Sequence, residues 1–90
     1  MFFRRPKITI RSDAPSFELL RHALSQYGVE VLPDGEEREL QSLRMDDIDL
    51  LEAIQLVEKF VGAKVDRKIL LPATKLNQLA EAIDQTRGSR

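Results

Sequence analysis

Three aspartates lie within four residues of the sequence, at Asp46, Asp47 and Asp49, just before a run whose apolar residues recur at helical spacing. Clustered carboxylates can bind a metal ion or serve as an acid and a base. Hard cations need six or more oxygen ligands, however, and this stretch has neither the length nor the glycine of a calcium-binding loop. Adjacent residues at a helix start also point in different directions, so we do not expect a metal site. The place would suit a nucleophile or a modification site, yet no serine, cysteine or histidine stands there.

Helix capping is the simplest role for these three aspartates. The first amide groups of a helix have no partner within the helix, and a side-chain carboxylate can accept hydrogen bonds from them. The helix dipole also favours negative charge at this end, and each effect contributes about 0.5–1 kcal/mol. Capping accounts for one or two of the three acids.

Other groups that could do chemistry are few. The sequence has no cysteine and a single histidine, His22, so neither a thiol nucleophile nor a cysteine-containing zinc site can be built. We expect His22 to be a partly buried structural residue on a helical face. The protein is therefore predicted not to be an enzyme and to hold no metal or cofactor.

Charge is distributed unevenly along the 90 residues, although the formal net charge is only −1. Residues 1–29 carry five bases and two acids, residues 30–58 two bases and ten acids, and residues 59–90 seven bases and three acids. An acidic block of this kind repels nucleic acid and favours protein partners with basic surfaces.

Membrane insertion and secretion are not indicated by the sequence. No apolar run approaches the roughly 20 residues that span a bilayer. The opening Met-Phe-Phe-Arg-Arg-Pro-Lys lacks the apolar core of a secretory signal, so a cytoplasmic location is expected. The segment Phe2-Phe3-Arg4-Arg5 combines aromatic and basic residues, and we interpret it as a tail.

The elements that position these groups follow from the apolar spacing. It predicts helices over residues 16–27, 47–61 and 75–87. Ser16 is the expected N-cap of the first helix, and Gly28 is well placed to end it.

These three helices predict an all-α fold. Each has one apolar stripe, and none is stable alone at this length, so the stripes must pack together. We expect a small bundle of three main helices and one short helical turn within residues 36–45. The bundle would form a single domain over residues 14–88, preceded by an extended arm over residues 1–13.

The central helix is predicted to supply much of the core. Ile48, Leu51, Ile54 and Val61 recur at helical spacing along it. We expect Leu51 and Ile54 to be central, so that truncating either to alanine costs about 2–5 kcal/mol.

An α+β or α/β domain is the alternative fold. Residues 7–11 alternate and are rich in β-branched side chains, and residues 29–32 and 65–71 could form two further strands. The resulting order, βαβαβα, is an established pattern for a sheet with helices packed on it.

The central region resembles that of acyl carrier proteins. In that family an Asp-Ser-Leu-Asp motif opens the central helix, a glutamate follows its second acid by three residues, and an aromatic-Gly pair closes it. The corresponding residues here are Asp46-Asp47-Ile48-Asp49, Glu52 and Val61-Gly62. The resemblance extends over about residues 16–85 and is strongest over 40–65. It implies a helical bundle, in agreement with the apolar spacing.

The resemblance also implies a function without a prosthetic group. Asp47 stands where the family has the serine that carries phosphopantetheine, and a carboxylate cannot replace the hydroxyl in that transfer. In the family, acids along this helix meet basic patches on partner proteins. The matching acids here are Asp46, Asp49, Glu52 and Glu58, and Asp47, at the position of the serine, adds a fifth carboxylate to the expected partner-binding residues. We therefore expect a non-catalytic interaction module that binds a basic partner. The alternative is a small α+β regulatory or subunit domain whose strands join the edge of a partner's sheet.

Overall fold

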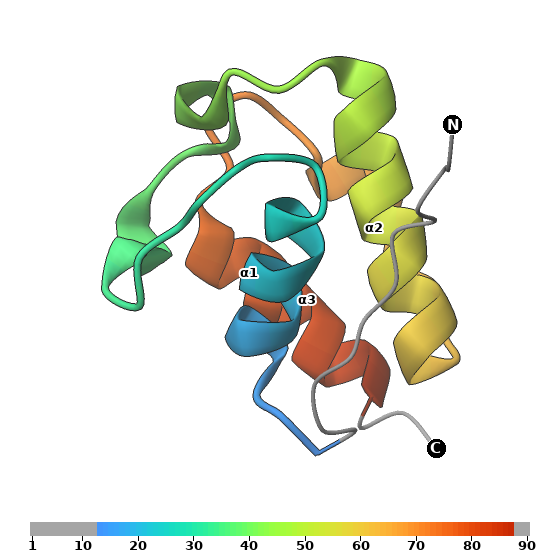
Figure 1. Ribbon diagram of the computed structural model, residues 1–90. Coiled ribbons are helices and arrows are strands. Elements are labelled where there is room, and N and C mark those ends of the chain that lie inside the picture. Colours follow the sequence, from blue (N-terminus) through green and yellow to red (C-terminus); the bar gives the residue numbers. More distant parts are fainter. Residues whose placement is uncertain (1–12, 88–90) are drawn as a thin grey trace, which may run out of the picture.

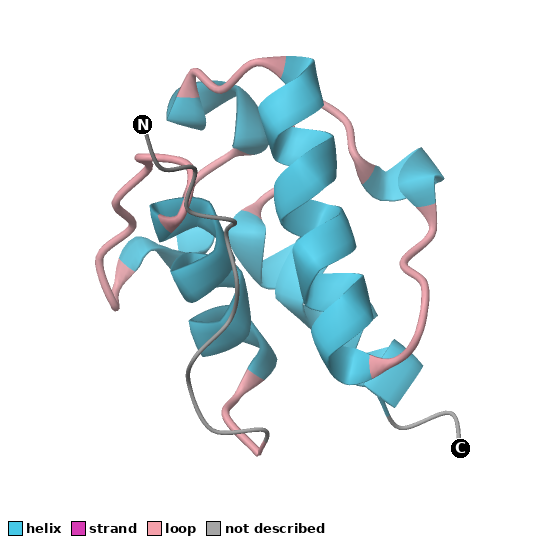
Figure 2. Ribbon diagram, turned by 45° about the vertical axis from the view of Figure 1, so that its right-hand side comes forward, coloured by secondary structure: helices cyan, strands magenta, loops and turns pink. Residues whose placement is uncertain are grey.

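Three α-helices form the framework of the computed structural model, which describes residues 13–87 (Figure 1). α1 spans Ser16–Ser25, α2 spans Asp47–Val61 and α3 spans Leu76–Arg87. Three short 3-10 turns connect them: η1 at Gly35–Glu37, η2 at Leu40–Leu43 and η3 at Arg67–Ile69. Within the described residues there are helices and loops and no strand, as Figure 2 shows, so the predicted all-α fold is confirmed.

The α+β alternative is wrong for the two of its strands that lie in the described part. Residues 29–32 are a loop and residues 65–71 hold η3, and no backbone hydrogen bond pairs either segment with a partner strand among the described residues. The third strand, at residues 7–11, lies outside the described residues. So do the Phe2-Phe3-Arg4-Arg5 segment and all of the expected arm except Asp13.

The connections hold more helical turns than the sequence predicted. One turn was expected within residues 36–45, and η1 and η2 both fall in or next to this range. η3 was not predicted at all. The carboxylate of Asp66 accepts a hydrogen bond from the amide of Lys68 at 2.9 Å, which stabilises the start of this turn.

α1 packs against both other long helices. The hydroxyl of Ser16 donates to the carboxylate of Asp84 on α3, and Nη1 of Arg87 donates to the carbonyl of Ala14 at 2.7 Å. Ser16 was expected to cap α1, but it is the buried first residue of the helix, and Pro15 stands at the N-cap without a side-chain hydrogen bond. The hydroxyl joins two helices instead of capping one.

Glycines end α1 and α2 as the sequence indicated. At Gly28, with φ 79°, the amide of Val29 donates to the carbonyl of Leu24 at 3.1 Å, and the amide of Gly28 donates to that of Ser25 at 3.1 Å. These two bonds form a Schellman motif, in which the left-handed residue is usually glycine. Gly62, with φ 75°, closes α2 through a 2.8 Å bond from its amide to the carbonyl of Glu58.

The core draws on all three helices and on the loops between them. Its residues are Leu19, Leu20, Ala23, Leu24, Val31, Leu40, Leu43, Ala53, Ile54, Val57, Val61, Val65, Leu76, Leu79 and Ile83. Ile54 is fully buried, as predicted, but Leu51 and Ile48 are 40% and 69% exposed. The prediction of a core role for these two residues is wrong, because each step of three residues turns a helix by about 60° from the previous position. Ile48 thus lies about 120° away from Ile54 around the helix.

Backbone hydrogen bonds join the loop before α2 to the loop after it. The amide of Leu40 donates to the carbonyl of Thr74 at 2.8 Å, the amide of Gln41 to that of Pro72 at 3.0 Å, and the amide of Leu76 to that of Arg38 at 2.8 Å. Glu39 and Lys75 form an isolated bridge within this pairing. These bonds therefore hold the segment that leads into α2 against the segment that leads into α3.

Candidate functional site

The start of α2 presents carboxylates that do not cap the helix. Asp46 occupies the N-cap position, where its carbonyl accepts the amide of Leu50 at 3.0 Å, but its side chain forms no capping hydrogen bond. Asp47 and Asp49 lie in the first turn. The predicted capping by side-chain hydrogen bonds is thus absent at Asp46, and the interaction of these charges with the helix dipole remains.

Four acids lie at the start of α2, with Asp46 at the N-cap and Asp47, Asp49 and Glu52 on different sides of the first two turns. Asp46, Asp47 and Glu52 are exposed and Asp49 is half-buried. Glu52 accepts a hydrogen bond from the hydroxyl of Tyr27 at 3.3 Å, whereas the three aspartate side chains make no hydrogen bond or ion pair with residues 13–87. We call Asp46, Asp47, Asp49 and Glu52 the acidic surface.

Glu58 lies in a different environment. It is 8% exposed, and its carboxylate accepts hydrogen bonds from Nη1 and Nη2 of Arg67 at 2.6 and 2.8 Å and from the amide of Val65 at 2.7 Å. The bond from Arg67 holds the pKa of Glu58 below its usual value, with the Val65 amide and the Arg67 charge acting in the same direction against burial. Because Arg67 and Val65 already engage this carboxylate, we do not place Glu58 among the residues available to a partner.

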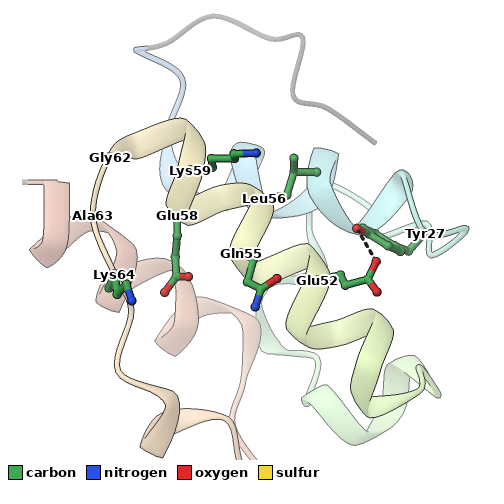
Figure 3. Close-up of a pocket in the computed structure, with 9 residues that line it drawn as sticks. All are labelled: Tyr27, Glu52, Gln55, Leu56, Glu58, Lys59, Gly62, Ala63 and Lys64. Atoms are coloured by element: carbon green, nitrogen blue, oxygen red, sulfur yellow. Dashed lines mark hydrogen bonds between the residues drawn. The ribbon is translucent and has the colours of Figure 1, made fainter. Parts of the chain in front are cut away.

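A shallow hollow of about 740 Å³ runs along the outer side of α2 (Figure 3). Its lining residues are Tyr27, Glu52, Gln55, Leu56, Glu58, Lys59, Gly62, Ala63 and Lys64. We call it the Tyr27 hollow. Partial burial raises the pKa of the Tyr27 phenol, and the neighbouring Glu52 carboxylate raises it further. Tyr27 and Glu52 thus form an acidic, hydrogen-bonded end of this hollow.

A second cleft, of about 750 Å³, lies on an adjacent side of the same helix and shares Gln55 with the Tyr27 hollow. Its lining residues are Leu40, Met45, Asp47, Leu50, Leu51, Gln55, Arg67, Leu70, Leu71 and Pro72. We call it the Leu51 cleft. This cleft was not predicted from the sequence, because the apolar spacing placed Leu51 in the core. The signal was present, since α2 has more apolar residues than one buried stripe requires.

The remaining candidates form no further site. His22 is half-buried on α1, in keeping with a structural role. Residues 13–87 contain no group of three or more histidine, aspartate or glutamate side chains that could hold a metal ion. In the same part of the chain, every helix is too short or too polar to cross a bilayer.

The surface around α2 combines charged and apolar groups, and no serine, cysteine or histidine lines either hollow. Carboxylates, exposed apolar side chains and two hollows share one helix. Comparison of the chain with protein-family models, curated proteins and solved structures gives no match.

Proposed function

We propose that this protein is a non-catalytic interaction module that binds a protein with a basic surface through the acidic surface at the start of α2. The observation that carries the proposal is the state of Asp46, Asp47 and Asp49. Their side chains make no hydrogen bond or ion pair with residues 13–87, so none of the three carboxylates forms a capping bond there. Acidic groups gathered in this way steer a basic partner and select against an acidic one.

The resemblance of the sequence to acyl carrier proteins supports this proposal. The three-helix order fits the expected bundle, and Asp47 is exposed at the first position of α2, where that family presents its serine. A carboxylate there could form only a labile acyl phosphate with phosphopantetheine. We therefore propose a carrier-like domain that is recognised by partners but carries no arm.

Modification by a phosphopantetheinyl transferase tests the carrier-like part of the proposal. We expect the intact mass of the wild type to stay unchanged after incubation with transferase and coenzyme A. We expect Asp47→Ser to gain the mass of one phosphopantetheine group, because a hydroxyl then stands at the start of α2. A wild type that gains this mass, or a folded Asp47→Ser variant that never does, would contradict the carrier-like assignment.

Recovery of partners by variants of the acidic surface tests the proposed binding to a basic protein. A tagged wild type and two triple variants would be used to recover partners from the source cells, with recovered proteins identified by mass spectrometry. The test variant is Asp46→Asn/Asp49→Asn/Glu52→Gln, and the control variant, with the same change in charge at exposed positions elsewhere, is Asp34→Asn/Glu36→Gln/Glu81→Gln. We expect a basic protein to be retained by the wild type and the control and lost from the test variant. Equal retention by all three chains would refute the role of the acidic surface.

A further inference from the structure

We infer that the outer side of α2 binds a helical segment of its partner in one orientation. It thus distinguishes the direction of that segment as well as its charge. The partner that fits is a helical protein segment with basic residues at one end, acidic residues at the other and an apolar stripe between them. This inference rests on the proposed function and adds the orientation of the bound segment.

Four exposed residues of α2 form one stripe that faces away from the core. Ile48, Glu52, Gln55 and Lys59 are spaced by four, three and four residues, which places them within about 60° of one another around the helix. The stripe therefore changes along its length from apolar, through acidic and neutral, to basic. We call these four residues the outer stripe.

The charges beside the outer stripe change in the same direction. Asp46, Asp47 and Asp49 lie at its beginning, while Lys59 and Lys64 line the Tyr27 hollow near its end. Figure 3 shows Glu52 beside Tyr27 at one end of the hollow and Lys64 at the other. Neither lysine ammonium group makes a hydrogen bond or an ion pair with residues 13–87. Glu52 and Lys59 thus present opposite charges on one face, while Asp47 and Asp49 lie about 100° to either side of Ile48.

The separation of these charges sets the length of the partner segment. Glu52 and Lys59 are seven positions apart on the same side of one continuous helix, which corresponds to about 10 Å along its axis. A partner helix running alongside needs about seven residues, or two turns, to place a base near Glu52 and an acid near Lys59.

Apolar contacts supply the affinity that exposed charges do not. Ile48 is 69% exposed, Leu51 is 40% exposed and, across the Leu51 cleft, Leu71 is 59% exposed. Exposed ion pairs add little to affinity because water screens them, but they discriminate between orientations of the same segment. The Leu51 cleft shares Gln55 with the Tyr27 hollow, so apolar and charged contacts can form on one bound helix.

Synthetic helical peptides of about 18 residues, all with the same leucine stripe, test this inference. The bipolar peptide carries lysines in one half and glutamates in the other. The alternating peptide has the same composition with lysine and glutamate interleaved. A third peptide carries lysine at every charged position. Binding is measured at low salt by fluorescence anisotropy, and amide chemical shifts identify the residues in contact.

We expect the bipolar peptide to bind about three- to tenfold more tightly than the alternating peptide, the range that two or three exposed ion pairs give. Its contacts should include Ile48 and Leu51. In the variant Lys59→Glu/Lys64→Glu this advantage should disappear, and the all-lysine peptide should become the tighter ligand.

Equal binding of the bipolar and alternating peptides to the wild type overturns the directional inference. The proposed function survives that result if the all-lysine peptide still binds and if Asp46→Asn/Asp49→Asn/Glu52→Gln weakens it. If the all-lysine peptide does not bind, or if it binds the triple variant as tightly as the wild type, binding through the acidic surface is refuted as well.

Discussion

The hydrogen bonds made by Glu58 predict that a single isosteric substitution, Glu58→Gln, destabilises the fold. The two carboxylate oxygens accept three bonds, from Nη1 and Nη2 of Arg67 and from the amide of Val65. A glutamine offers one oxygen, and its amide nitrogen turns N–H groups toward the donors of Arg67. At least one of the three bonds is lost, and the charge of Arg67 loses its partner.

The size of the effect follows from the strength and exposure of these bonds. A hydrogen bond to a charged group contributes about 1.5–3 kcal/mol. The side chain of Arg67 is 40% exposed, so water compensates for part of the loss, and we expect Glu58→Gln to lower the free energy of unfolding by about 2 kcal/mol. For a domain of this size that corresponds to a decrease in Tm of roughly 8–16 °C.

Urea and thermal unfolding followed by circular dichroism measure this change. The matched control is Glu81→Gln, the same substitution at an exposed position of α3. The pKa of folded Glu58 lies below its ordinary value of 4.5, so the stabilisation is fully present above that pH and is lost as the pH falls through the lower pKa. The difference between wild type and Glu58→Gln should therefore close in acid. If Glu58→Gln at neutral pH is as stable as Glu81→Gln, the structural role assigned to Glu58 is refuted.

Two further predictions concern α2 and Tyr27. Ile54→Ala should lower the free energy of unfolding by about 2–5 kcal/mol, because Ile54 is fully buried. Leu51→Ala, at a 40% exposed position, should lower it by less than about 1.5 kcal/mol. Equal losses in urea denaturation would show that the assignment of the buried face of α2 is mistaken. Tyr27 is the only tyrosine in a chain without tryptophan, so ultraviolet absorbance reports its titration directly. Its pKa should lie above 10.0 and should fall in Glu52→Gln, and an unchanged titration curve would argue against the contact with Glu52.

The positions of the helices could be predicted because their signals are local. Apolar residues at helical spacing fixed the three long elements, and Gly28 and Gly62 marked the ends of two of them through a backbone conformation that favours glycine. The 3-10 turns were less accessible. η3 depends on one side-chain bond from Asp66 and on the packing of the loop around it, and neither has a periodic pattern.

The rotation of α2 could not be predicted with the same accuracy. Ile48 and Leu51 are as apolar as Ile54, so the sequence offers two overlapping stripes, and the packing of α1 against α2 selects one of them. For the same reason the exposed apolar face and the Leu51 cleft were missed.

Among the acids, sequence alone could not separate Glu58 from Asp46, Asp49 and Glu52. The residues that distinguish it, Val65 and Arg67, come after the end of α2. They meet its carboxylate only because Gly62 reverses the chain at that point.

The pairing of the loops on either side of α2 has a consequence for how such a domain could diversify. Because the amides of Leu40 and Leu76 close the backbone around the helix, the outward residues between them contribute little to holding the frame together. Substitutions there can change what the domain recognises while the scaffold stays constant. Domains with this one framework could thus bind different partners through different outward side chains on the same 15-residue helix.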